Sequence, residues 1–159
     1  MNLGRCYKSF LPLLTIILSA VYVDSLDVNI GVSSQVQLPL KQGSSVTLKC
    51  QGSESYEYCT WSHGPNKCKF EWKRHVTLVS GEIRRTYCSN YFTGRLHFAG
   101  DYSKHECSIQ LTKSRISDHG EWNCTLEKYV LGNWEGDKDT ATFNLTIEPR
   151  EKKGNLFYS

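Results

Sequence analysis

The sequence predicts an all-β fold, an antiparallel β-sandwich, on the basis of two observations. Short segments in which apolar and polar residues alternate recur at roughly 8–15-residue spacing, with polar turns between them. No stretch shows a convincing 3.6-residue apolar period of the kind that marks an amphipathic helix. Alternation of this kind is typical of strands with one buried and one solvated face.

The expected strands follow one another as short runs. Residues 35–38 alternate, residues 41–44 form a turn, and residues 46–50 alternate again. Three later runs also direct apolar side chains to one face. The residues that share a face within these runs are Val46, Leu48 and Cys50; Cys107, Ile109 and Leu111; Trp122, Cys124 and Leu126; and Phe143, Leu145 and Ile147.

Residues 1–25 have the features of a secretory signal peptide. Arg5 and Lys8 form a basic start, residues 10–23 are apolar, and Val23 and Ser25 suit the positions before a cleavage site. The alternative is a membrane anchor, but an apolar run of about 14 residues is short for a span of roughly 20. We therefore expect a secreted chain without a membrane span, with a domain over residues 26–148 (core about 30–148) and a polar tail over residues 149–159.

Length, charge and cysteine content exclude several classes of protein. A chain of 159 residues fits one domain and is too short for a two-domain enzyme. Its net charge of +3 is too small for a dedicated nucleic-acid-binding protein. Six of the seven cysteines follow the leader, and this even number predicts three disulfides. A zinc site is the competing interpretation, and the absence of any Cys-x2-Cys pair weighs against it.

A motif near the C-terminal end is the most specific signal in the chain. Residues 118–124, Asp-His-Gly-Glu-Trp-Asn-Cys, resemble the Asp-x-Gly-x-Tyr-x-Cys signature of immunoglobulin-superfamily domains. Upstream, Cys50 and Trp61 are similar to the first cysteine and the core tryptophan of that family, and residues 95–98 resemble the start of its strand D. The resemblance covers about residues 30–148 and implies a variable-like sandwich with Greek-key connections. It also implies that Arg95 pairs with Asp118, which lies two residues before Gly120 in the same motif.

Two features depart from the family pattern. Trp122 replaces the corner tyrosine, and its indole N–H can still donate a hydrogen bond. The Gly-x-Gly of receptor variable domains is absent before Phe143, which argues against antibody-style pairing of two domains. Trp72 is an alternative candidate for the core tryptophan. If Trp72 has that role, residues 51–68 would form an insertion held by disulfide bonds. The additional cysteines resemble those of invertebrate members of the family.

The resemblance implies that a disulfide between Cys50 and Cys124 joins the two sheets. If Trp61 faces the core, Cys59 faces it too, and Cys107 is in phase with buried residues of the opposite sheet. We therefore favour Cys59–Cys107. Cys68–Cys88 then remains and joins the segment after Trp61 to a loop before residues 95–98. The alternative pairs neighbours along the chain, Cys59 with Cys68 and Cys88 with Cys107.

Catalytic constellations are weak. A cysteine nucleophile needs a free thiolate, and the six cysteines are better used in disulfides. Asp101, Ser103 and His105 are close in sequence, but alternation and turns make triad geometry improbable. We therefore expect no enzymatic activity, no cofactor and no metal site.

Positive charge is concentrated in residues 63–95, which hold seven Lys or Arg residues against two Glu, a net charge of +5. Such a face could bind an acidic protein or a sulfated glycan, and the alternative is an ordinary solvated face. Arg95 is discounted because Asp118 is expected to pair with it. The remaining candidate ligand-binding residues of this window are Lys67, Lys69, Lys73, Arg74, Arg84 and Arg85.

A second candidate is the segment over residues 129–139, which is expected to be a surface loop at one end of the sandwich. It displays Tyr129, Leu131 and Trp134 among glycines and charges. Exposed tryptophan and tyrosine are favoured as interface anchors. Alternatively, Tyr129 and Val130 extend the preceding strand and Trp134 folds back over the sheet edge.

Together these features predict a secreted immunoglobulin-like recognition module that binds an extracellular or cell-surface protein. The sequons at Asn123 and Asn144 predict N-glycosylation. Alternatives are a glycosaminoglycan-binding matrix component and a soluble truncated form of a cell-surface receptor. The sequence does not specify the ligand or the oligomeric state.

Overall fold

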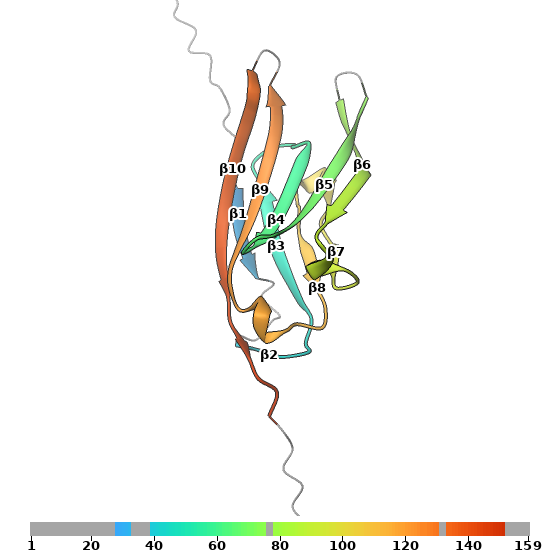
Figure 1. Cartoon of the computed structure of the whole chain (residues 1–159). Helices are drawn as coiled ribbons and strands as arrows, with labels where there is room; N and C mark the ends of the chain where they lie inside the picture. The colour runs from blue at the N-terminus through green and yellow to red at the C-terminus, as the bar shows by residue number, and fades with distance from the viewer. Residues whose placement is uncertain (1–27, 33–38, 76–77, 131–132, 152–159) are drawn as a thin grey trace, which may run out of the picture.

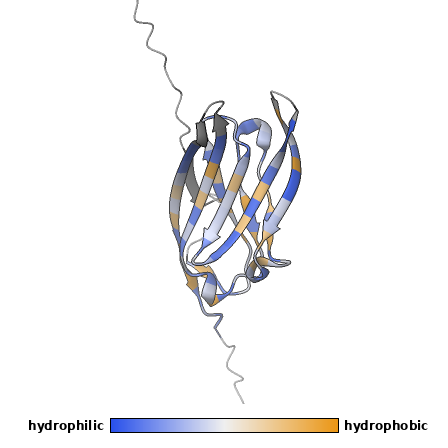
Figure 2. Ribbon diagram, turned by 45° about the horizontal axis from the view of Figure 1, so that its top comes forward, coloured by the Kyte–Doolittle hydropathy of each residue, from blue (hydrophilic) through white to orange (hydrophobic). Residues whose placement is uncertain are grey.

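The structure, a computed structural model, describes residues 28–32, 39–75, 78–130 and 133–151, and within these ranges it is all-β. Apolar and polar residues alternate along the strands (Figure 2), as expected from the sequence. No α-helix occurs among the described residues, which include three short 3-10 segments. These are η1 (Asn90–Phe92), η2 (Tyr102–Lys104) and η3 (Ile116–Asp118).

The larger sheet has five antiparallel strands in the order β10-β9-β4-β5-β6. Its middle strand, β4, pairs with β5 on one side and with β9 on the other. The strands are β4 (Tyr58–His63), β5 (Asn66–His75), β6 (Leu78–Cys88), β9 (Gly120–Val130) and β10 (Asn133–Leu145).

The smaller sheet has four antiparallel strands in the order β1-β3-β8-β7. They are β1 (Val28–Val32), β3 (Val46–Gly52), β7 (Leu96–Phe98) and β8 (Ile109–Leu111). A separate parallel pair joins β2 (Leu40–Lys41) to β11 (Ile147–Glu148), which follows directly after β10.

The two sheets bury one common core between them. In β3 every second side chain is buried, beginning with Val46, and the same holds for Trp122, Cys124 and Leu126 in β9. These are faces that the alternation of the sequence predicts. Apolar burial of this kind is the main stabilising contribution, at roughly 25 cal/mol per Å².

Two hairpins define one end of the molecule. Strands β5 and β6, and likewise β9 and β10, extend toward the same end beyond the smaller sheet (Figure 1). Residues expected to form a surface loop after Lys128 therefore belong largely to strands, since β9 continues to Val130 and β10 begins at Asn133. The loop prediction was wrong in its boundaries, and the alternative that Tyr129 and Val130 extend the preceding strand is confirmed. The side chain of Trp134 lies outside the described residues. The expected strand over residues 35–38 lies outside the described residues. The other expected runs are extended.

Candidate functional site

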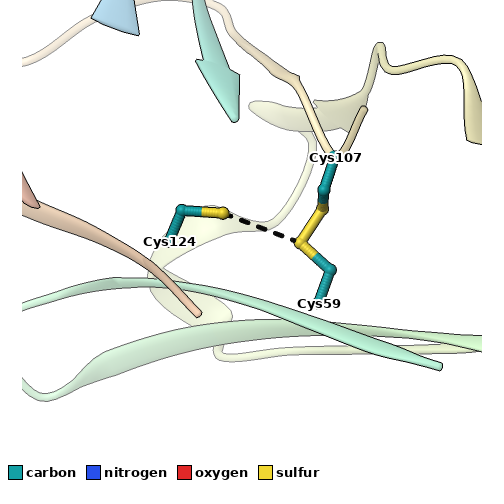
Figure 3. A group of neighbouring side chains, drawn as sticks. All are labelled: Cys59, Cys107 and Cys124. Carbon is teal, nitrogen blue, oxygen red and sulfur yellow. Dashed lines mark hydrogen bonds between the residues drawn. A yellow bond between two sulfur atoms is a disulfide. The ribbon is translucent and has the colours of Figure 1, made fainter. Parts of the chain in front are cut away.

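The core is bonded across the two sheets by a pair of adjacent disulfides. Cys50 of β3 is joined to Cys124 of β9, and Cys59 of β4 is joined to Cys107, which lies just before β8. The Sγ atoms of Cys59 and Cys124 are 4.0 Å apart (Figure 3). Both sulfurs are in disulfides and carry no hydrogen, so this is a packing contact rather than a hydrogen bond. The alternative pairing of Cys59 with Cys68 is not present.

The same sulfurs are spaced closely enough to resemble a metal site. Those of Cys59, Cys107 and Cys124 all lie within 4.8 Å of one another. Metal binding by cysteine requires the thiolate, and each of these sulfurs is in a disulfide. The cluster as bonded is therefore a structural element.

Trp61 lies at the centre of this cluster. It faces Cys124 on one neighbouring strand and Cys68 on the other, and it is fully buried. Its indole N–H donates to the backbone carbonyl of Cys107 at 2.7 Å, which links the larger sheet to the smaller. Trp61 is thus the tryptophan beside the inter-sheet disulfides, and the interpretation of residues 51–68 as an insertion was wrong.

Trp72, the rival tryptophan, is buried in a second aromatic cluster. Its ring stacks on Tyr102 at a centroid distance of 5.3 Å and meets the edge of Tyr56 at 4.9 Å. Burial raises the pKa of Tyr102 to about 12 and also raises that of Tyr56. The cluster supports the β5–β6 hairpin from its inner side.

The third disulfide joins Cys68 of β5 to Cys88, the last residue of β6. The two residues are direct cross-strand partners, with their Cα atoms 3.9 Å apart. We expected Cys88 to lie in a loop, but it ends a strand. This disulfide fixes the two strands of the hairpin to each other.

Arg95 and Asp118 form a buried ion pair where β7 meets η3. The guanidinium Nη1 donates to Oδ2 at 2.7 Å, and the backbone N–H of Arg115 donates to the same oxygen at 2.7 Å. Tyr91 donates its hydroxyl to Oδ1. The sequence resemblance implies this pair, whereas the role of Tyr91 was missed.

The pKa of Asp118 reflects these contacts. Burial by itself would raise the pKa of the carboxyl, but hydrogen bonds from Arg95, Tyr91 and the Arg115 backbone outweigh it, so the pKa lies below its ordinary value. Trp122, in place of the corner tyrosine, donates its indole N–H to the Asp118 carbonyl at 2.9 Å. Gly120 has a φ of +115°, which glycine adopts without strain.

The outer face of the larger sheet is a candidate binding surface. In β5 the buried residues are Cys68, Phe70 and Trp72, so the residues between them face outward. Strand pairing sets Lys69 opposite Tyr87 of β6. Tyr87 is 53% exposed, and the Lys69 ammonium lies 4.0 Å from the ring centroid of Tyr58 in β4.

Most cations of the predicted basic face are paired with carboxylates. Lys69 lies 3.6 Å from Glu127, and Arg84 lies 3.2 Å from Glu71. Lys73 pairs with Glu82, and Arg74 pairs with Glu57. Within the part of the chain that the structure describes, Lys67 and Arg85 have no carboxylate within salt-bridge distance. The net charge of +5 in the sequence window therefore overstates the positive charge of this surface.

The second predicted site is only partly described. Leu131 lies outside the described residues. The backbones of Tyr129 and Trp134 belong to β9 and β10, at the end toward which the hairpin extends.

Candidate catalytic side chains have structural partners. The Ser103 hydroxyl donates to Asp101 at 2.6 Å, and the Ser103 backbone N–H donates to the same carboxylate at the start of η2. Both ring nitrogens of His63 lie 2.8 Å from backbone carbonyls, those of Glu121 and Ser117, and the ring stacks on Trp122. The Ser103 contacts cap η2 locally, whereas those of His63 connect β4 to β9 and to the turn before it.

Sequence reasoning missed the tyrosines of the outer face, Tyr58 and Tyr87. Tyr58 precedes Cys59 and Tyr87 precedes Cys88, so each is directed to the face opposite its cysteine. That alternation is the signal that could have identified them.

Two comparisons with known proteins provide no family assignment. No protein-family model matches the chain, and no curated protein matches it. Among the described residues, no helix has the length and apolar character needed to cross a membrane. The three disulfides indicate an oxidising environment.

Proposed function

We propose that the chain is a secreted immunoglobulin-like recognition module that binds another extracellular protein and has no catalytic role. The observation that carries the proposal is the combination of two facing sheets, the Cys50–Cys124 disulfide between them, and Trp61 packed beside it. The buried Arg95–Asp118 pair adds to the resemblance. In immunoglobulin-like domains this frame supports binding surfaces on strands and loops.

The described chemistry favours binding over catalysis. The six described cysteines are in disulfides, so none of them offers a thiolate nucleophile. The outer face of the larger sheet instead presents tyrosines beside long cationic side chains. Tyrosine and arginine are enriched in protein–protein interfaces.

Binding of a multimer to cells tests this proposal. Residues 26–159, expressed through the secretory pathway and tetramerised, should bind saturably to cells or tissue sections of the source organism. A tetramer of the reduced and alkylated chain should not bind, because it lacks the folded surface. Absence of saturable binding across the tissues tested would contradict a recognition function.

A further inference from the structure

The two sequons lie side by side on the outer face of the larger sheet. Trp122, Cys124 and Leu145 point into the core, so Asn123 of β9 and Asn144 of β10 point outward. Asn123 pairs with Thr142, two residues before Asn144, which makes the two asparagines diagonal neighbours at roughly 7–8 Å. Glycans at both positions would cover the β9–β10 half of this face.

The hydrogen bonds of Asn123 are compatible with a glycan. Its Oδ1 accepts from the Thr142 hydroxyl at 2.6 Å, and its Nδ2 donates to Glu121 at 3.1 Å. A glycosylated amide nitrogen keeps one N–H, and the carbonyl oxygen is unchanged. Both hydrogen bonds can therefore persist, and they would hold the first sugar in place. Asn144 is exposed.

The β5–β6 half of the face carries a different set of side chains. The basic–aromatic strip consists of Lys67 and Lys69 of β5, Arg85 and Tyr87 of β6, and Tyr58 of the adjoining strand β4. Within it Lys69 covers the Tyr58 ring, and Arg85 donates to the Tyr87 hydroxyl at 3.0 Å. The strip has no sequon of its own. Ser62 of β4 pairs with both Asn123 and Lys67, so a glycan on Asn123 would border the strip at Lys67, whereas Arg85 and Tyr87 on β6 lie farther from it.

The Cys68–Cys88 disulfide makes this strip rigid. Lys67 and Lys69 flank Cys68 on β5, and Tyr87 directly precedes Cys88 on β6. The covalent bond fixes the spacing of the two strands beneath these side chains. A surface ordered in advance loses less conformational entropy on binding.

The charges of the strip indicate the chemistry of its partner. Lys67 and Arg85 lack a carboxylate partner among the described residues, while Lys69 is held by Glu127. A sulfated glycan binds best to densely clustered unpaired cations, whereas here carboxylates are interspersed with them. Two unpaired cations beside two tyrosines are better matched by acidic side chains on a protein surface.

We propose that this face is divided in function, with N-glycans on its β9–β10 half and an acidic protein partner bound to the basic–aromatic strip on its β5–β6 half. This inference rests on the proposed recognition function. It differs from a site at the end of the β9–β10 hairpin, because it assigns binding to the opposite edge of the sheet.

An introduced glycan tests the strip. The substitution Arg84→Asn creates a sequon with Thr86 on β6, and Arg84→Asn with Thr86→Ala removes the same arginine without creating it. Both chains are secreted and tetramerised, and binding to cells that bind the unmodified tetramer is measured. The glycan-bearing variant should lose about tenfold or more of its binding, while the matched control stays within about twofold. Intact mass shows whether the glycan is present.

A second variant gives a result even if residue 84 is not glycosylated. Arg85→Glu with Tyr87→Ala should also reduce binding about tenfold. Lys49→Glu, on the exposed surface of the smaller sheet, should leave binding unchanged. Binding that withstands both strip variants would overturn the assignment of the strip while leaving the recognition function in place. Failure of the unmodified tetramer to bind would instead contradict the recognition function.

Two further arms test the partner and the glycans. Polyglutamate should compete with binding, and heparinase treatment of the cells should leave it unchanged. Loss of binding after heparinase would identify a sulfated glycan and overturn the protein partner. Peptide mass analysis should find glycans on Asn123 and Asn144, and Asn→Gln at both positions should preserve binding. Unmodified asparagines would overturn the glycan half of the proposal.

Discussion

Arg95 and Asp118 are held together by two hydrogen bonds, from Nη1 to Oδ2 at 2.7 Å and from Nη2 to Oδ1 at 3.2 Å. Both side chains are buried, with 3% and 0% exposure. The pair links the segment before β7 to the turn before β9, and therefore ties the smaller sheet to the larger one. Its removal should affect the whole fold rather than one loop.

Breaking this ion pair on one side should destabilise the protein strongly. We expect Arg95→Met to lower the free energy of unfolding by about 3–5 kcal/mol, because it leaves the buried Asp118 carboxylate without its charge partner. Lys41→Met provides a control, since Lys41 pairs with Glu148 at an exposed site where solvent screens the charges, so its loss should change stability far less. Urea denaturation of both variants measures the difference. Equal effects would contradict the structural role of the buried pair.

The acid sensitivity of folding should depend on Asp118. Its pKa in the folded protein lies below the ordinary value of 3.8, so the unfolded chain binds the proton more readily. The stabilisation is complete above that value and is lost as the pH falls through the lower folded pKa. Asp118→Asn should therefore be less stable at pH 7 and lose less further stability below about pH 4. Parallel pH dependences for the two proteins would contradict the assignment.

The two buried tryptophans should respond differently to replacement by phenylalanine. Trp61→Phe removes the donor to the Cys107 carbonyl, which costs about 1–3 kcal/mol beyond the loss of packing. Trp72 offers a matched comparison, because its buried indole N–H has no partner among the described residues. Trp72→Phe should therefore cost less. Chemical denaturation compares the two variants, and a larger loss for Trp72→Phe would be inconsistent with this difference.

Removal of each disulfide should have a graded effect on stability. The Cys50–Cys124 bond spans 74 residues and the Cys68–Cys88 bond spans 20. Loss of unfolded-state entropy predicts contributions of about 4 and about 3 kcal/mol respectively. Paired alanine variants, compared by thermal unfolding, should show the smaller loss for Cys68–Cys88. If only that variant failed to fold, the hairpin disulfide would stabilise the whole domain rather than the hairpin alone, contrary to this prediction.

The sequence predicts the core better than the outer surface, for a physical reason. Val46, Leu48 and Cys50 alternate with polar residues, and a period of two is visible in sequence without knowledge of neighbours. The partners of Lys69 and Arg84 depend instead on strand register. In β5 and β6 a register shift near Trp72 changes which residues face each other, and no local sequence feature indicates that shift.

Residues 129–139 show the converse limit. Their glycine and charged residues favour a loop, yet Tyr129 and Trp134 are in strands because cross-strand pairing continues along the hairpin. The Arg95–Asp118 pair was accessible only through the resemblance of residues 118–124 to a known motif. The tyrosine Tyr91, which completes that site, lies outside the motif and was not predicted.

Thiol titration and disulfide mapping of the secreted protein test most directly whether the cysteines are structural bridges of a binding module. We expect no free thiol in the denatured, unreduced protein and no bound zinc. Proteolysis should yield peptides joined as Cys50–Cys124, Cys59–Cys107 and Cys68–Cys88. Two or more free thiols among these cysteines, or zinc bound by them in place of the disulfides, would contradict this disulfide framework. Metal or thiol chemistry would then be the function to test.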